Sequence, residues 1–412
     1  MVVVSLVGTG AYEPVTYRWD ANGRSYRTEA IAEALAHIFE ATQVFVLATA
    51  RAQQSRNLAV LRDRLGDRLA VVSIPDGTSQ EELWEIFDRC TESIPTGSRV
   101  VLDITHAFRS LPLVVVGAVA YLQRTRRVEI ARIVYGAYEA KDASGCVPIF
   151  DMTLLVDLLE WIVSAEALQR RGDATLLARQ LQQTHQRLWQ DGTTGDLPQS
   201  LKGAADELER LSRAVHLARP REVLVTAADL LPKFDAIESE AARWAKPFGV
   251  IAADVRAELE RIAYKGADKG ADQLDAENLR RQLALVAYML EKRLLVQATM
   301  LAREWLVSWV AYHSGIADWL NRAAREAVEA RINGAAHGGE GTLADIPSWQ
   351  QLVRVWKCIA DLRNDIAHCG MNENPVGAGR LESRLRDVLA AMEKLAKSLD
   401  APDRRDPEPS SG

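Results

Sequence analysis

The stretch Ala360–Gly370, ADLRNDIAHCG, closes a long run of residues with helical periodicity. At 100° per residue the apolar residues of this run fall within a stripe about 80° wide, which predicts a helix packed on a core. These residues are Leu352, Val355, Ile359, Leu362 and Ile366. Asn364 and His368 are four residues apart and share the opposite, polar face, and Arg363 lies at the edge between the faces. The final glycine is a typical helix stop. The pattern therefore predicts a helix that displays three polar side chains near its C-terminal end.

These three side chains suit the cleavage of a phosphodiester bond in RNA. A neutral imidazole can take the proton of a ribose 2′-OH, and an imidazolium can protonate the departing 5′-oxygen. The guanidinium of Arg363 can stabilise the charge on the phosphoryl oxygens, and Asn364 can orient the imidazole or the phosphate. The alternative is that Arg363 and His368 are helix-end cations favoured by the helix dipole. Spacing alone leaves both interpretations open.

The first ~150 residues alternate between apolar strands and helical segments, as in a parallel, doubly wound sheet. Ligands of such sheets bind beyond the carboxyl ends of the strands. Strands are predicted at Val2–Val7, Gln43–Thr49, Leu69–Pro75, Arg99–Thr105 and Val128–Tyr138.

The residues after four of these strands are typical of a ligand pocket. Glycines allow backbone N–H groups to approach an anion, and hydroxyl groups can donate hydrogen bonds to it. The segments are Gly8-Thr9-Gly10, Thr49-Ala50-Arg51, Asp76-Gly77-Thr78 and Thr105-His106. The alternative is a set of ordinary capped turns. A dinucleotide site is disfavoured because GTGAYE lacks the third glycine of the fingerprint.

From Asp151 onward the sequence has helical periodicity throughout. The short link KGADKGAD at Lys265–Asp272 divides these helices into two groups, and the tail 401–412 has the composition of a disordered segment. A long helix is predicted from Glu277 to His313, with Trp305 and Trp309 as core residues or dimer contacts. Further helices are predicted near 151–168, 174–190, 199–218, 221–244, 248–264, 316–332, 348–369 and 379–399.

Composition places the chain among ordinary cytoplasmic proteins. It has 412 residues and a net charge of −6, which disfavours broad binding of long nucleic acid but is compatible with a local pocket for a few nucleotides. Its four cysteines lack metal-ligand spacing, which indicates reduced thiols. The longest apolar run, Leu111–Leu122, is shorter than the ~18 residues of a membrane span. Near Arg363 only Asp361 and Asp365 supply carboxylates, both on the predicted polar side, so we expect metal-free chemistry.

Three stretches of the sequence resemble one known family. RNDIAH (363–368) resembles the R-x4-H signature of HEPN ribonucleases, and LDITHAFRSLPL (102–113) resembles the D-x-T-H-G motif of CRISPR-associated CARF domains. SLVGTGAYEPVTY (5–17) is similar to the first strand and loop of CARF domains. One departure is Ala107, where the motif has glycine. The resemblance implies a Rossmann-like CARF domain at 1–150, a helical linker at 151–272, an all-α HEPN domain at 273–400 and a tail at 401–412.

The resemblance also implies a function. The protein would be a metal-independent endoribonuclease of type III CRISPR antiviral defence, which cleaves single-stranded RNA when cyclic oligoadenylate binds. The expected activator is cyclic tetra-adenylate, with no other cofactor and no metal. The assembly would be a homodimer or higher homo-oligomer in the cytoplasm, with a site composed of two facing motifs. The products would be a 2′,3′-cyclic phosphate and a 5′-OH.

The implied site residues fall into two sets. The catalytic residues are Arg363, Asn364 and His368, and the ligand-binding residues are Gly8, Thr9, Gly10, Thr49, Asp76, Gly77, Thr105, His106 and Arg109. Two alternatives remain: a non-catalytic nucleotide-binding regulator, and a toxin-type HEPN ribonuclease with a different ligand. The regulator is disfavoured because the sequence has no basic helix-turn-helix pattern.

Overall fold

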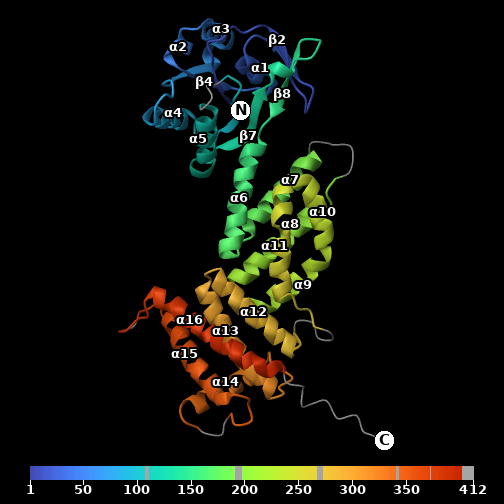
Figure 1. Cartoon of the computed structure of the whole chain (residues 1–412), viewed down its shortest axis with the longest axis vertical. Helices are drawn as coiled ribbons and strands as arrows, with labels where there is room; N and C mark the ends of the chain where they lie inside the picture. Colours follow the sequence, from blue (N-terminus) through green and yellow to red (C-terminus); the bar gives the residue numbers. More distant parts are fainter. Residues whose placement is uncertain (107–110, 191–196, 267–271, 340–342, 372, 401–412) are drawn as a thin grey trace. The chain divides into compact units, whose positions relative to one another are not determined.

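The computed structural model describes residues 1–106, 111–190, 197–266, 272–339, 343–371 and 373–400. The chain divides into two compact units, Met1–Leu159 and Glu160–Gly412. The first contains a β-sheet with helices, and the second is helical throughout its described part (Figure 1). The predicted fold class, an α/β domain followed by helices, is confirmed.

The sheet of the first unit has eight strands in the order β3-β2-β8-β7-β6-β1-β4-β5. Pairing is parallel from β7 through β6, β1 and β4 to β5, and also between β2 and β8, whereas β7·β8 and β2·β3 are antiparallel. The strands are β1 (Val2–Leu6), β2 (Val15–Trp19), β3 (Ser25–Thr28), β4 (Gln43–Ala48), β5 (Leu69–Ser73), β6 (Arg99–Asp103), β7 (Glu129–Gly136) and β8 (Cys146–Asp151).

The sequence patterns missed β2, β3 and β8, so the sheet is mixed rather than wholly parallel. Strand β2 buries alternate residues, unlike the fully apolar parallel strands that the prediction sought. It forms a hairpin with β3 through a turn in which Gly23 has a φ of +72°, a conformation that glycine adopts without steric cost.

Helices cover both faces of the sheet because neighbouring strand residues point to opposite sides. Val3 lies in the core under α1 (Ile31–Ile38) and α3 (Arg56–Leu65), and Val4 lies in the core under α4 (Gln80–Ser93) and α5 (Leu111–Thr125) (Figure 1). The short helix α2 (Ala50–Gln53) follows β4 directly. All five predicted parallel strands are present, so their carboxyl ends meet at one edge of the sheet.

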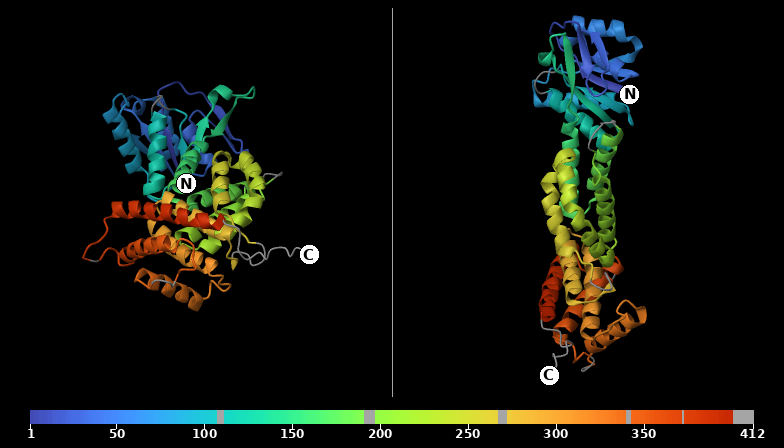
Figure 2. Two further views of the ribbon diagram at one scale, coloured as in Figure 1. Left: turned by 60° about the horizontal axis from the view of Figure 1, so that its bottom comes forward. Right: turned by 90° about the vertical axis from the view of Figure 1, so that its right-hand side faces the viewer.

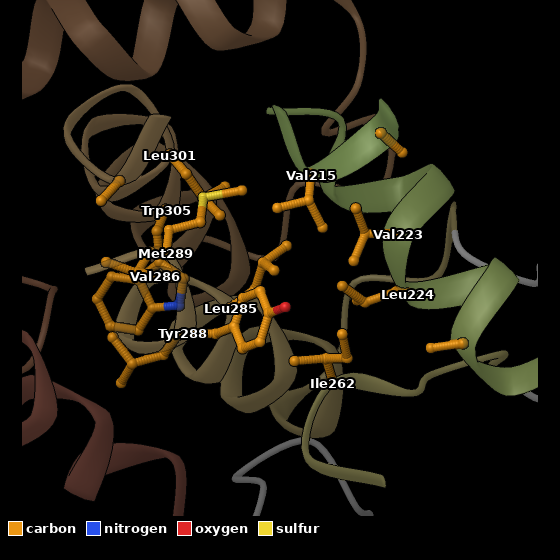
Figure 3. Packing of buried hydrophobic residues seen from close by; sticks show 14 of the residues in the cluster. Val215, Val223, Leu224, Ile262, Leu285, Val286, Tyr288, Met289, Leu301 and Trp305 are labelled. Carbon is orange, nitrogen blue, oxygen red and sulfur yellow. The ribbon is translucent and has the colours of Figure 1, made fainter. Parts of the chain in front are cut away.

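The second unit is a set of packed helices around one continuous apolar core (Figure 2). Trp305 and Trp309 are fully buried in that core, so they are core residues, the first of the two predicted roles. Figure 3 shows Trp305 among the packed side chains, and its indole donates to the carbonyl of Leu279 at 2.8 Å. The helices are α6 (Leu154–Arg171), which begins in the first unit, α7 (Thr175–Gln190), α8 (Leu201–His216), α9 (Pro220–Leu230), α10 (Phe234–Trp244), α11 (Lys246–Ile262), α12 (Ala276–Glu291), α13 (Leu295–His313), α14 (Arg322–Ala336), α15 (Trp349–Ala367) and α16 (Ala378–Ala396).

Two predicted long helices are each divided in the structure. The helix expected over 277–313 is α12 followed by α13, with a break where Arg293 adopts a φ of +59°. The adjacent Lys292 is buried and its ammonium donates to the carbonyl of Gln169 at 2.9 Å and to the carboxylate of Glu258, which holds the break in place. The helix expected over 221–244 is α9 and α10, separated at a turn that contains Pro232.

Candidate functional sites

A cavity of about 600 Å³ lies in the first unit, where the carboxyl ends of β1, β4, β5 and β6 meet. Seven of the nine predicted ligand-binding residues line it: Gly8, Thr9, Gly10, Thr49, Asp76, Thr105 and His106. Arg109 lies outside the described residues. Strand ends separated by up to ~100 positions in the sequence are therefore brought to one place, as the parallel topology requires.

Gly77 does not line the cavity, whereas its neighbour Thr78 does. A Cβ at Gly77 would meet the side chain of Leu111 at 3.0 Å and that of Ile86 at 3.3 Å. Its backbone has a φ of +76°, which favours glycine. Gly77 therefore allows a tight turn over the apolar core and does not face the cavity.

The histidine of the cavity is held against an aromatic ring. The imidazole of His106 stacks on the ring of Tyr12, with centroids 4.2 Å apart and planes 18° apart. The Tyr12 hydroxyl accepts a hydrogen bond from the Gly8 amide at 2.8 Å, and burial raises the pKa of Tyr12 to about 12. Tyr12 was missed in the sequence, although its position four residues after Gly8 in the same loop was a signal that an aromatic ring lay near the strand ends.

His106 is a neutral hydrogen-bonding group in this environment. Burial lowers its pKa below the ordinary value, and the opposing effect of the Asp103 carboxylate is smaller. Its Nε2 atom is buried and has no hydrogen-bond partner among the residues that the structure describes. An unsatisfied buried nitrogen is costly, so a ligand that supplies its partner gains affinity at this point.

Asp103 organises the end of β6 from inside the sheet. Its carboxylate is fully buried and accepts from the Ser5 hydroxyl at 2.6 Å and from the Thr105 amide and hydroxyl at 2.9 and 2.5 Å. The Thr105 hydroxyl in turn accepts from the amide of Gly136 at 2.7 Å. Burial raises the pKa of Asp103 despite these donors. Thr105 thus lines the cavity, but its hydroxyl holds β6 and β7 together and is already satisfied.

The charged groups of the cavity are Arg51 and Asp76. Arg51 is the second residue of α2, and within the described part of the chain its guanidinium forms no ion pair. Thr49 caps the same short helix, because its side chain accepts from the amide of Ala52 at 3.4 Å. The cavity therefore offers a free guanidinium and a free imidazole nitrogen, which are suited to an anionic ligand with polar edges.

The predicted catalytic residues lie at the end of α15. Leu352, Val355, Ile359 and Leu362 are buried as expected, whereas Ile366 of the same predicted stripe is half-buried. Asn364 and His368 are exposed on the other side. Arg363 is half-buried and its Nη1 donates to the Asn364 side-chain oxygen at 3.3 Å. The Arg363 Nε atom is buried with no partner among the residues that the structure describes. Guanidinium, amide and imidazole therefore occupy neighbouring positions on one helix end, and His368 is accessible to solvent.

The placement of Asp365 on the polar side was wrong. Its side chain is buried and accepts from the amide of Val376 at 3.3 Å, so it holds the segment that follows the helix. That segment turns sharply because Cys369 and Gly370 both have positive φ, and the Gly370 amide donates to the Asp365 carbonyl at 2.8 Å. Periodicity within the helix did not predict this burial, because it depends on where the chain turns after the helix.

The described residues bear on two further possibilities, a metal site and a membrane span. Among these residues, no three His, Cys, Asp or Glu side chains are grouped so as to hold a metal ion. None of the described helices combines the length and apolarity required to cross a bilayer.

Comparisons with known proteins bear on both units. Residues 2–139 match the family model of the CARF domain of the CRISPR system endoribonuclease Csx1. Residues 157–265 match the model of the second domain of the CRISPR-associated protein MJ1674. The curated MJ1674 protein of Methanocaldococcus jannaschii is 26% identical over 161 residues, which is 38% of this chain and 23% of that protein. The match therefore spans less than a quarter of the relative's length.

A solved structure is similar over nearly the whole chain. Csm6 of Enterococcus italicus, bound to cyclic hexa-2′-fluoro-hexa-dAMP, aligns with 97% of this chain and 94% of its own. The sequence identity is 8% and the TM-score is 0.44. The two family models and the curated relative together indicate that the chain carries an N-terminal CARF domain and is related to CRISPR-associated accessory proteins.

Proposed function

We propose that this protein is an endoribonuclease of type III CRISPR defence that cyclic oligoadenylate activates. The observation that carries the proposal is the cavity at the strand ends, which lies in the part of the chain that matches the Csx1 CARF domain. A cyclic oligoadenylate is an anion with aromatic bases, and the cavity offers the guanidinium of Arg51 and the Nε2 of His106, neither of which has a partner among the described residues. Cyclic tetra-adenylate is the proposed activator.

The proposed catalytic site is the polar end of α15, in a HEPN-like domain that covers 273–400. His368 is exposed, so its imidazole can exchange protons with solvent, and it acts on the ribose 2′-OH or on the leaving 5′-oxygen. Arg363 stabilises the charge of the pentacoordinate phosphorus, and Asn364 orients the guanidinium with which it shares a hydrogen bond. The 2′-oxygen attacks phosphorus, the P–O5′ bond breaks, and the fragments carry a 2′,3′-cyclic phosphate and a 5′-OH.

One chain supplies one such histidine, whereas the reaction requires a base and an acid. The proposal therefore includes a homodimer in which two α15 ends face one RNA strand. The activator switches the enzyme on by binding one dimer arrangement more tightly than the other. The remaining domain assignments, a CARF domain at 1–150 and a linker at 151–272, are supported by the two family-model matches within them. The protein acts in the cytoplasm.

The test is a cleavage assay on fluorescent single-stranded RNA with and without synthetic cyclic tetra-adenylate and cyclic hexa-adenylate. We expect slow cleavage alone and at least tenfold faster cleavage with one of the two rings. Binding of a ring without any cleavage would favour a non-catalytic regulator. Cleavage that neither ring accelerates, together with no binding of either, would favour a toxin-type ribonuclease with another ligand.

A further inference from the structure

We infer that Asn57 is a positioning residue for the activator site. It is not one of the predicted ligand-binding residues, and it acts by fixing the loop Gly8–Tyr12. This inference rests on the proposed function of the cavity. Asn57 lies on α3, is 7% exposed, and donates through its single side-chain nitrogen to two loop carbonyls. The distances are 2.9 Å to the Gly8 oxygen and 2.8 Å to the Gly10 oxygen.

The two hydrogen bonds determine which backbone groups the loop presents. Carbonyl oxygens repel an anionic ligand. Asn57, from α3, donates hydrogen bonds to the carbonyls of Gly8 and Gly10, the two residues on either side of Thr9. The amides of Thr9 and Gly10 have no hydrogen-bond partner within the described residues. Backbone N–H groups free of partners are donors for a phosphodiester. Asn57 therefore fixes a loop in which the carbonyls of Gly8 and Gly10 are satisfied, whereas the amides of Thr9 and Gly10 have no partner among the described residues.

The loop lies between two cavities. Thr9, Gly10 and Tyr12 line the cavity of about 600 Å³ and also a second cavity of about 470 Å³, which Asn57 itself lines. The loop contains no helix or strand, so side chains rather than a backbone ladder must hold it. Tyr12 holds it from one end through the Gly8 amide, and Asn57 holds it from α3.

The support that carries Asn57 is rigid. Ser55 caps α3 by accepting from the amide of Leu58 at 3.4 Å, and its hydroxyl donates to the Ala52 carbonyl at 2.6 Å. Leu58, Leu61 and Leu65 anchor the helix in the core under the sheet. Asn57 thus transfers the position of a packed helix to the loop that contacts the ligand.

The substitution Asn57→Asp tests this role, because a carboxylate has the same shape but cannot donate to the two carbonyls. Isothermal titration with cyclic tetra-adenylate and cyclic hexa-adenylate should show at least a tenfold loss of affinity. Thr42→Val is the matched control, since it removes a 3.1 Å side-chain bond to the Met1 carbonyl at the opposite end of β1. Its affinity should match the wild type. An affinity of Asn57→Asp within twofold of the wild type would overturn the inference.

A second readout separates positioning from general destabilisation. If Asn57 acts through the loop, Thr9→Ala should cost much less affinity in the Asn57→Ala background than in the wild type, whereas independent effects would multiply. Hydrogen exchange of the Gly8 amide, which donates to the Tyr12 hydroxyl at 2.8 Å, should accelerate at least tenfold in Asn57→Ala, with slow exchange preserved in β4. This comparison needs no ligand. Unchanged exchange would overturn the inference, and failure of the wild type to bind either ring would overturn the proposed function instead.

Discussion

The imidazole of His106 lies stacked on the phenol ring of Tyr12, 4.2 Å away, and its Nε2 atom has no partner among the described residues. The hydroxyl of the same tyrosine accepts a hydrogen bond from the Gly8 amide, so one aromatic side chain orients both the histidine and the first loop of the cavity. This relationship links the end of β1 to the end of β6. Burial at this position lowers the pKa of the imidazole in the folded domain.

The first prediction concerns pH. Because the pKa of His106 is lowered in the folded domain, the unfolded chain takes up a proton at a higher pH than the folded one does. The unfolded state therefore binds more protons as the pH falls below about 6.5, and stability decreases there. The raised pKa of Asp103 acts with the opposite sign above the ordinary aspartate pKa of about 3.9, because the folded state there binds more protons than the unfolded state.

Denaturant unfolding of the wild type and of His106→Asn between pH 5 and 7.5 measures this effect. We expect the stability of the wild type to decline more steeply with falling pH than that of the variant. Equal slopes would show that the histidine titrates alike in both states.

A second prediction concerns the charge of the ligand. Arg51→Gln should lower the affinity for cyclic oligoadenylate by about tenfold, roughly 1.4 kcal/mol, since a free guanidinium is lost from the cavity. It should also weaken the dependence of the affinity on salt. Arg24→Gln is the control, because Arg24 is ion-paired with Glu40 at 2.8 Å and does not line the cavity. A loss of affinity with an unchanged salt dependence would argue against a phosphate contact.

A third prediction concerns the packing beneath the cavity. At Gly136 an added Cβ would meet Tyr17 at 3.2 Å and would collide with the side chain of Ile31. Gly136→Ala should destabilise the first unit by about 1–3 kcal/mol. Gly117, inside α5, has open space around the same position, so Gly117→Ala should stabilise by roughly 0.5–1 kcal/mol. Urea unfolding of both variants measures the contrast, and similar effects would refute the packing argument.

A fourth prediction concerns the cleavage chemistry. His368→Ala should reduce the activated rate at least a hundredfold and leave activator binding unchanged, because the imidazole transfers the reacting protons. His337→Ala is the control, since His337 is likewise an exposed histidine at the C-terminal cap of a helix. Wild-type cleavage should persist in excess EDTA and should stop when the cleaved position carries 2′-deoxyribose. Cutting at the deoxy position, or loss of cutting in EDTA, would exclude attack by the 2′-oxygen without metal.

Local pattern was sufficient for the five strands β1, β4, β5, β6 and β7 and for α15, because the apolar residues of each element follow its own periodicity. It also placed Thr9, Asp76 and His106 at one cavity, since parallel topology collects strand ends whatever their distance in sequence. Pattern could not find Asn57, whose partners are 49 and 47 residues away. No local periodicity records such a contact. The burial of Asp365 was missed because it depends on where the chain turns after α15.

The hairpin at the end of the sheet has a consequence for self-association. Strand β2 buries alternate residues on one face, and without a neighbour its free edge would be a template for pairing with another chain. Strand β3 covers that edge with only four residues, and it exposes Ser25 and Arg27. Because β3 is short and polar, it is itself a poor template for pairing with another chain. Replacement of Ser25 and Arg27 by valine should therefore make β3 an apolar edge and promote aggregation of the domain.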